Sequence, residues 1–394
     1  MSFQPANNPC PCESGREFHL CCGTVQTGEL KIFADLSESV PENEQINLTP
    51  ALQDAVRNIA ETPDLFPVKL TPALNEVIWV KMSPYWFSES TFLNPQRIMG
   101  RCALRSSMEY LSNSVDDKQS LSTPYIFHSA FCGSTLMSRG LELIYNSLPL
   151  REPQILCNLL YASLSGVLNE EAELSLRHRI INLLARRFEP SQVPVVKAND
   201  YSNAYLEKIM TSSVQSPILL MYSNLNEFIA GCLKSEDRIN WVLERFHLVE
   251  NYFQDIFENK TIFNQNSISN IDKAAVYWSY NIKLFSSAIK QFPDRIKTLD
   301  IEQLLASPLE VVDACGEWFG LEKLSDVNAK DEINWLMGVH AKETRYKYSP
   351  EQRKSELNSI LEDKTAELVQ AEIVARVLLG NDYPDEGLPQ AIMH

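Results

Sequence analysis

The chain has 394 residues, of which 44% are hydrophobic and 22% are charged, and its formal net charge is −16. These values predict a globular protein with more than one domain, and the negative charge argues against nucleic-acid or anionic-membrane partners. No apolar run approaches the ~20 residues of a membrane span, and the N-terminus is too polar for a signal peptide, so we expect a cytoplasmic protein.

Residues 1–24 contain four cysteines with the spacing C-x-C-x8-C-C, namely Cys10, Cys12, Cys21 and Cys22. Clustered cysteines in the cytoplasm are metal ligands rather than disulfides, and four thiolates can close a tetrahedral zinc site. A segment this short would take its folding energy from the metal. The surrounding Pro-Cys-Pro-Cys and Cys-Cys-Gly residues resemble the SEC-C motif, a small zinc module. This resemblance implies a structural Zn²⁺ and docking of a protein partner rather than catalysis.

Residues 25–120 are expected to form a linker followed by a mixed N-terminal segment. The part up to about residue 50 is polar and acidic, which is typical of a linker. Beyond it, apolar spacing predicts a helix over 52–59, a strand or buried segment over 76–81 and a helix over 93–111. No recognisable catalytic motif falls in this segment.

From residue 121 to 330, short apolar runs alternate with helical patterns. Strands are predicted over 125–128, 193–197, 217–222 and 295–301, and helices over 136–147, 169–187, 203–213, 226–235 and 272–290. This alternation predicts an α/β fold with a three-layer, P-loop-type parallel sheet flanked by helices. The tail, 331–394, is predicted to contain a basic loop over 340–350 and a helical extension over 355–379.

The loop between the first predicted strand and its helix is the best candidate for a binding site. It reads His128-Ser129-Ala130-Phe131-Cys132-Gly133-Ser134-Thr135. The free N–H groups of a first helical turn and the helix dipole favour an anion there. The lysine of a Walker A box is missing, which disfavours an ordinary nucleoside triphosphatase or kinase. Two other interpretations remain open: Ser134 and Thr135 as plain helix caps, and Cys132 as a nucleophile with His128.

Four segments resemble, in order, the sulfotransferase family. Gly133-Ser134-Thr135-Leu136 match its phosphosulfate loop, Glu152 lies where tyrosylprotein-type members carry a general base, and Lys197 matches a lysine that follows a strand. Residues 298–321, TLDIEQLLASPLEVVDACGEWFGL, resemble a late segment of the family. The resemblance covers residues 121–325. It implies an enzyme that transfers a sulfuryl group from a nucleotide donor, phosphoadenosine phosphosulfate, to a hydroxyl-bearing acceptor.

The resemblance also implies roles for individual residues. The donor would be bound by the loop and by two cations of the tail: Ser129, Cys132, Gly133, Ser134, Thr135, Arg345 and Lys347. Lys197 would stabilise charge on the leaving oxygen, Glu152 would be the general base, and His128 is a second candidate base. Structural readings stay open for the same residues: Glu152 could begin a helix, Lys197 could lie on the surface, His128 could be structural, and the basic loop could be solvated.

Three positions depart from the family pattern. Phe131 stands where the family has a cation that contacts the transferring sulfate. Ser223 and Gly231 stand where it has the arginine and serine that bind the donor's 3′-phosphate. Serine cannot match the strength of an arginine–phosphate pair. Two other hypotheses therefore stand beside the sulfotransferase: a nucleotide- or protein-binding protein without turnover, and a phosphotransferase.

Overall fold

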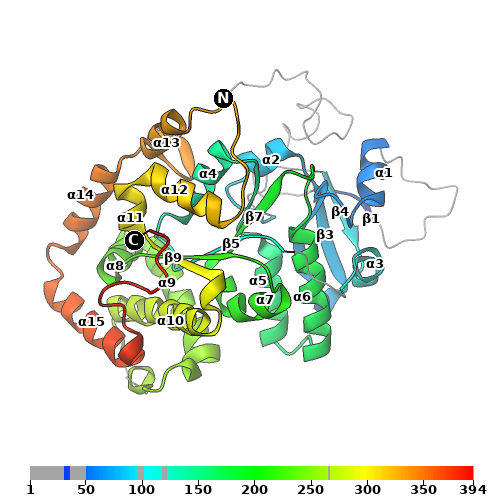
Figure 1. Ribbon diagram of the computed structural model, residues 1–394. Coiled ribbons are helices and arrows are strands. Elements are labelled where there is room, and N and C mark those ends of the chain that lie inside the picture. Colours follow the sequence, from blue (N-terminus) through cyan, green and yellow to red (C-terminus); the bar gives the residue numbers. More distant parts are fainter. Residues whose placement is uncertain (1–30, 36–49, 96–101, 118–121, 265–266, 394) are drawn as a thin grey trace. The chain divides into compact units, whose positions relative to one another are not determined.

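The computed structural model describes residues 31–35, 50–95, 102–117, 122–264 and 267–393. The chain divides into two compact units, each of which is built from separate stretches of sequence (Figure 1). Unit 1 consists of Met1–Tyr125, Tyr145–Ser216 and Leu321–Lys323, and unit 2 of Ile126–Ile144, Pro217–Gly320 and Leu324–His394. The predicted core segment, 121–330, therefore contributes to both units.

Unit 1 contains a four-stranded sheet in the order β1-β4-β3-β2. Its strands are β1 (Lys31–Asp35), β2 (Leu65–Thr71), β3 (Glu76–Lys81) and β4 (Cys102–Ser106). Neighbours among β2, β3 and β4 are antiparallel, whereas β1 is parallel to β4. β3 confirms the strand predicted over 76–81. All of its residues after Glu76 are buried, so it lies in the core of this unit.

The helix predicted over 93–111 is wrong for residues 93–95, which are not helical, and for 102–106, which form β4; only its end lies in a helix, the short α3 (Met108–Ser114). Pairing with β3 decides the strand: the two strands are antiparallel, with Val77 opposite Ser106 and Val80 opposite Ala103. Such non-local pairing overrides local helical spacing. The helix predicted over 52–59 is confirmed as α1 (Pro50–Arg57). A further helix, α2 (Pro84–Glu89), was not predicted.

Two parallel strands of unit 1, β6 (Ser147–Arg151) and β7 (Val193–Lys197), place Arg151 opposite Lys197. The sequence predicts β7 but not β6. Proline does not account for the difference, because β7 also contains one, Pro194. Pro149 is tolerated in β6 because β6 is an edge strand. Three helices complete this part of unit 1: α5 (Gln154–Leu164), α6 (Glu170–Leu184) and α7 (Leu206–Ser212).

Unit 2 contains the parallel strands β8 (Ile218–Tyr222) and β9 (Ile296–Asp300), joined through the long helix α10 (Asn270–Gln291) and its neighbours. β8 is buried at every position. The end of the chain covers the open side of β9: Thr298 N–H donates to Gln390 O at 2.9 Å, and Ile392 N–H donates to Thr298 O at 2.9 Å. The backbone groups of this edge strand are thereby partly paired.

Strand β5 (Tyr125–His128) stands between β7 and β8 in a five-stranded parallel sheet of order β6-β7-β5-β8-β9. Helices flank the sheet, so the predicted α/β class with a helix-covered parallel sheet is confirmed. The remaining helices of unit 2 are α4 (Ser134–Ile144), α8 (Leu225–Leu233), α9 (Glu236–Leu248), α11 (Ile301–Ala306), α12 (Pro308–Trp318), α13 (Ala329–Met337), α14 (Pro350–Leu361) and α15 (Thr365–Leu379).

The tail is more regular than the sequence predicts. The loop predicted over 340–350 contains a hairpin of β10 (Val339–His340) and β11 (Glu343–Lys347). The helical extension is confirmed, but it is split into α14 and α15. Within the described ranges, no helix combines the length and the apolar character needed to cross a membrane. The predicted zinc module, 1–24, lies outside the described residues.

Candidate functional site

The loop between β5 and α4 (Ser129–Gly133, the β5–α4 loop) has an unusual backbone. Ala130 and Phe131 have positive φ angles of 67° and 52°, and Gly133 has a φ of +74°. Positive φ is disfavoured for residues with a side chain. At Gly133 a β-carbon would also lie only 3.1 Å from Ile301 Cδ1. Gly133 is therefore required both by its backbone angle and by the close approach of α11.

Side chains predicted to bind a donor take part in shaping this loop. Cys132 Sγ donates to the carbonyl oxygen of Met221 at 3.4 Å, and the Ser129 N–H donates to the same oxygen at 3.0 Å. His128 Nδ1 accepts a hydrogen bond from the Ala130 N–H at 3.1 Å. Cys132 is fully buried, so its thiol contributes to packing against β8. These contacts favour a structural reading of Cys132 over a nucleophilic one.

The first turn of α4 supplies the anion-binding geometry. α4 begins at Ser134, and its first i to i−4 hydrogen bond runs from the Met137 N–H to Gly133 O at 3.0 Å. The N–H groups of Ser134, Thr135 and Leu136 therefore have no such partner within the helix. Together with the helix dipole, they favour an anion at this point. Because Gly133 precedes the helix, Ser134 and Thr135 are its first two residues rather than its cap.

Phe131 lies against residues of α8 and α9. A β-carbon at Gly231 would be 3.0 Å from both Cβ and Cγ of Phe131. The ring also meets Trp241 edge-on, with centroids 5.1 Å apart. Arg238 Cζ lies 4.8 Å from the ring centroid, and Arg238 Nη1 donates to Gly231 O at 2.8 Å. Burial lowers the pKa of Arg238.

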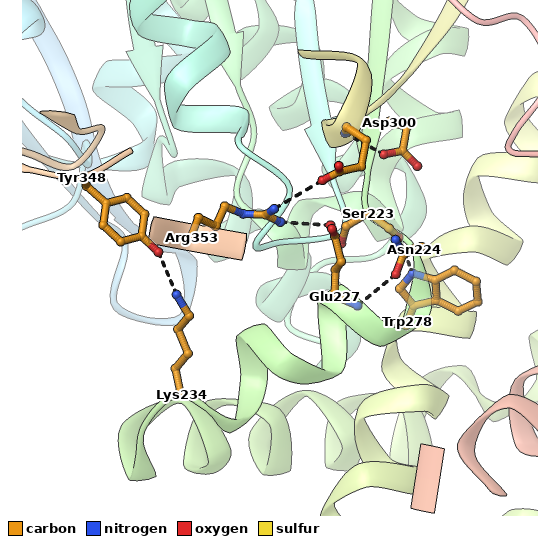
Figure 2. A network of polar contacts seen from close by, with 9 residues as sticks. Ser223, Asn224, Glu227, Lys234, Trp278, Asp300, Tyr348 and Arg353 are labelled. Carbon is orange, nitrogen blue, oxygen red and sulfur yellow. Dashed lines mark hydrogen bonds and ion pairs between the residues drawn. The ribbon is translucent and has the colours of Figure 1, made fainter. Parts of the chain in front are cut away.

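An acidic network follows the ends of β8 and β9 (Figure 2). Arg353 of α14 is hydrogen-bonded to Glu227 Oε2 at 3.0 Å and to Glu302 Oε1 at 3.4 Å. Asp300 caps α11 by accepting from the Glu302 N–H at 2.8 Å. Burial and the nearby charge of Glu227 raise the pKa of both Asp300 and Glu302. Two carboxyl groups, those of Glu227 and Glu302, thus share one guanidinium, and that of Asp300 lies near them.

The tail hairpin is hydrogen-bonded to α4, the helix that follows the β5–α4 loop. Arg139 Nε, on α4, donates to the carbonyl oxygen of Ala341 in the hairpin turn at 2.6 Å. Lys234, the residue that follows α8, donates to Tyr348 Oη at 2.9 Å (Figure 2). The predicted donor ligands Arg345 and Lys347 are on β11 with exposed side chains. The turn of the hairpin therefore reaches α4, while these two cations face solvent.

Unit 1 holds the other two predicted catalytic residues, and the structure brings them together. Lys197, the last residue of β7, donates from Nζ to Glu152 Oε1. Asn199 Nδ2 donates to Glu152 Oε2 at 3.1 Å, and the Glu152 N–H donates to Lys197 O at 2.6 Å. Glu152 has a φ of +51° and precedes α5 by two residues. Neither a helix start for Glu152 nor a surface position for Lys197 agrees with this geometry.

Sequence reasoning missed three residues that organise these sites. Asn199 orients Glu152, Arg238 stacks on Phe131, and Arg353 joins Glu227 to Glu302. Only Asn199 had a usable signal, because it follows Lys197 by two residues. The two arginines lie far along the chain from their partners, so only the fold could reveal them. In the described part of the chain, no group of side chains suits a metal ion.

Comparisons with known proteins give the following relatives. The model of the SEC-C motif matches residues 7–24, which include the four predicted zinc ligands. No curated protein matches the chain. A solved sulfotransferase domain from the curacin biosynthetic pathway is 14% identical, with 62% of this chain and 98% of that one covered and a TM-score of 0.35.

Two further solved structures are similar. A sulfotransferase from Mycobacterium tuberculosis H37Rv is 14% identical over 62% of this chain and 76% of that one, with a TM-score of 0.37. A sulfotransferase from Alicyclobacillus acidocaldarius is 15% identical over 66% and 96%, with a TM-score of 0.33. The chain therefore carries a SEC-C motif at its N-terminus, and the solved structures to which it is similar are sulfotransferases.

Proposed function

We propose that this protein transfers a sulfuryl group from a nucleotide donor to a hydroxyl group of an acceptor. The observation that carries the proposal is the start of α4. There, Gly133 permits a tight turn, and the unpaired N–H groups of the first helical turn can bind an anionic sulfate or phosphate group. The donor implied by the family resemblance is phosphoadenosine phosphosulfate, and its 5′-phosphosulfate is the group assigned to this turn.

In this proposal, Glu152 and Lys197 have complementary chemical roles. The acceptor hydroxyl attacks sulfur, its oxygen–sulfur bond forms, and the bond from sulfur to the bridging oxygen breaks. Glu152 takes the hydroxyl proton, and hydrogen bonds from Lys197 and Asn199 hold its carboxylate group in place. Lys197 offers positive charge for the leaving phosphate oxygen. His128 is the alternative base.

The proposal is tested by titrating the zinc-loaded full chain with adenosine 5′-phosphosulfate and with phosphoadenosine phosphosulfate in a calorimeter. We expect binding of at least one donor, and a loss of about tenfold in affinity for Thr135→Val, which corresponds to about 1.4 kcal/mol for one lost polar contact. Thr211→Val is the matched control, because Thr211 is exposed. Absence of binding by both donors at about 1 mM, an affinity of about −4 kcal/mol, would refute the proposal.

A second candidate function is nucleotide binding without turnover. It is favoured by Phe131, which occupies the expected position of a cation and packs against Gly231 instead. The two candidates differ in donor consumption, which can be followed with a sulfur-labelled donor even when the acceptor is unknown. Release of labelled sulfate that disappears in Lys197→Arg, with the fold retained, would exclude the second candidate.

We also propose that the SEC-C segment binds a structural Zn²⁺ through Cys10, Cys12, Cys21 and Cys22. Support comes from the match of residues 7–24 to the motif and from the affinity of thiolate sets for zinc. In this proposal the module serves for docking a protein partner, since its four ligands would leave no open coordination position for catalysis.

A further inference from the structure

We propose that the protein recognises its nucleotide through free ribose hydroxyls and that Glu227 selects against a phosphate at the ribose 3′ position. This inference rests on the proposed function and concerns the specificity of the same site. It is argued from the residues that follow β8 and β9 in unit 2, all of which are described by the structure.

The first step concerns the room for a side chain at position 231. The Phe131 side chain lies on Gly231 so closely that any side chain at position 231 would have its β-carbon 3.0 Å from both Cβ and Cγ of Phe131. Real β-carbons do not approach other heavy atoms freely at this distance in a packed interior. Phe131 and Gly231 are therefore mutually fitted. No hydroxyl donor can be added at 231 while Phe131 keeps this position.

The second step concerns the cations of the segment. Arg238 stacks on the Phe131 ring at 4.8 Å and donates to Gly231 O at 2.8 Å, so part of its fork of donors is engaged within the protein. Lys234 donates to Glu356 Oε2 at 2.8 Å and to Tyr348 Oη at 2.9 Å. Each positive charge already has an aromatic or polar partner, and Lys234 is paired with a carboxylate.

The third step concerns the charge that follows β8. The residue after the strand, Ser223, is fully buried and neutral, and its carbonyl accepts from Trp278 Nε1 at 2.9 Å. Asn224 then accepts from the Glu227 N–H at 2.9 Å, which occupies a donor of the first turn of α8 (Figure 2). The turn that could have received a phosphate is thus capped by a side chain of the protein.

The fourth step compares the local charges. Within the described residues, the ion pairs of Glu227 and Glu302 are both made to the guanidinium of Arg353, and Asp300 lies beside them without an ion pair to it. A phosphate dianion would add to this excess of negative charge and be opposed by it. A ribose hydroxyl, in contrast, can donate to a carboxylate. The same choice between a carboxylate for a sugar hydroxyl and an arginine for a sugar phosphate distinguishes the two nicotinamide cofactors in dinucleotide-binding folds.

Glu227 is the carboxylate best suited to this role. Its side chain is 19% exposed, and its Oε2 is paired with Arg353 at 3.0 Å. Glu302, at 52%, is mostly solvated. Asp300 is committed to capping α11. Glu227 is thus the specificity-determining residue of the proposal, with Arg353 as its positioning partner.

The experiment compares adenosine 5′-phosphate, adenosine 5′-phosphosulfate and adenosine 3′,5′-bisphosphate by calorimetry on the zinc-loaded full chain. We expect the bisphosphate to bind no more tightly than adenosine 5′-phosphate. Glu227→Gln should raise the relative affinity for the bisphosphate about tenfold, because it removes one charge and leaves Arg353 less neutralised. Glu310→Gln, a change at an exposed carboxylate of α12, is the matched control and should leave the ratio unchanged.

The outcomes separate this inference from the proposed function. Tenfold tighter binding of the bisphosphate by the unmodified chain would overturn the inference and leave the proposed sulfuryl transfer intact. An unchanged ratio in folded Glu227→Gln would overturn the role of Glu227. Absence of binding by all three nucleotides would overturn the proposed function and the inference with it. If Glu227→Gln fails to fold, the comparison of the nucleotides on the unmodified chain still decides whether a 3′-phosphate is disfavoured.

Discussion

Lys197 and Glu152 form an ion pair in which the side chains are only 1% and 12% exposed. The pair joins the last residue of β7 to the residue that follows β6, and parallel register places Arg151 opposite Lys197. Glu152 reaches its partner from a left-handed backbone conformation, and Asn199 holds its second oxygen. The fold of unit 1 therefore holds both members of this ion pair in place. Its two members should be studied together, since a change in one leaves the other buried and uncompensated.

The first prediction concerns this pair. Lys197→Met should lower the free energy of unfolding by about 3–5 kcal/mol, because it leaves a buried carboxylate without its counter-ion. Chemical denaturation followed by circular dichroism measures the effect. Lys208→Met is the matched control: Lys208 also pairs with a glutamate, Glu173, but its side chain is 47% exposed, so its loss should cost less than about 1 kcal/mol. Equal losses in the two variants would contradict the prediction.

The second prediction concerns the fit of Phe131 to Gly231. Gly231→Ser should destabilise the protein by about 1–3 kcal/mol through overpacking. In the background of Phe131→Ala, the same serine should cost less, because Cγ and Cδ2 of Phe131, which would lie 3.0 and 3.2 Å from its β-carbon, are gone and only the Phe131 Cβ contact remains. A double-mutant cycle of unfolding free energies gives the coupling between the two positions. Additive effects would show that the ring does not restrict position 231.

Most strands of the parallel sheet could be predicted from the sequence, because β5, β7, β8 and β9 are short apolar runs between helical patterns. β6 could not, since the short run Ser147–Arg151 directly follows α4 and becomes a strand through its parallel pairing with β7, a non-local contact. β4 was missed for a similar reason: its pairing with β3 is a non-local contact.

The candidate site was only partly predictable. Gly133, Ser134 and Thr135 could be found because a strand–loop–helix pattern has a local signature. The partnership of Lys197 with Glu152 spans 45 residues and depends on the register of two strands. The role of Arg353 depends on where α14 packs, which no local pattern specifies. Local chemistry can thus be read from sequence, whereas the partners of a charge require the fold.

The third prediction is a pair of opposite pH effects. Burial raises the pKa of Asp300, so folding favours its protonated form, and its charge opposes stability increasingly as pH rises above its unfolded pKa. Asp300→Asn keeps a capping side chain and should gain stability relative to the unmodified protein between pH 4 and pH 7. Burial also acts on Asp382, but hydrogen bonds from Lys283 and Lys290 outweigh it and lower its pKa.

The carboxylate of Asp382 therefore adds stability above its unfolded pKa, and that stability is lost as pH falls. Asp382→Asn should lose stability relative to the unmodified protein as pH rises from about 2 to about 5, because its lowered pKa lies below the unfolded value. Unfolding free energies of each variant at the two ends of its own pH range provide the measurement. Trends of the same sign in the two variants would contradict the assignment of opposite shifts.

The fourth prediction tests the proposed zinc module. The purified chain should contain one zinc ion, and Cys21→Ser combined with Cys22→Ser should abolish it, because two thiolates cannot complete a tetrahedral site. Ser14→Ala changes the same motif without removing a thiol and should retain the metal. Elemental analysis after dialysis gives the metal content. Zinc retained in full by the double variant would refute the assignment.

The fifth prediction separates backbone strain from crowding at the β5–α4 loop. Gly133 and Gly166 have nearly the same φ, +74° and +72°, but a β-carbon at Gly133 would lie 3.1 Å from Ile301 Cδ1, whereas at Gly166 nothing lies within 4 Å. Gly166→Ala should therefore cost only the left-handed strain, about 1–2 kcal/mol. Gly133→Ala should cost more, because Ile301 must also give way. If the loop binds the donor, Gly133→Ala should in addition weaken nucleotide binding, an effect that Gly166→Ala should not show. Equal destabilisation with unchanged binding would mean that α11 accommodates the extra methyl group and that the approach of Ile301 does not fix the shape of the loop.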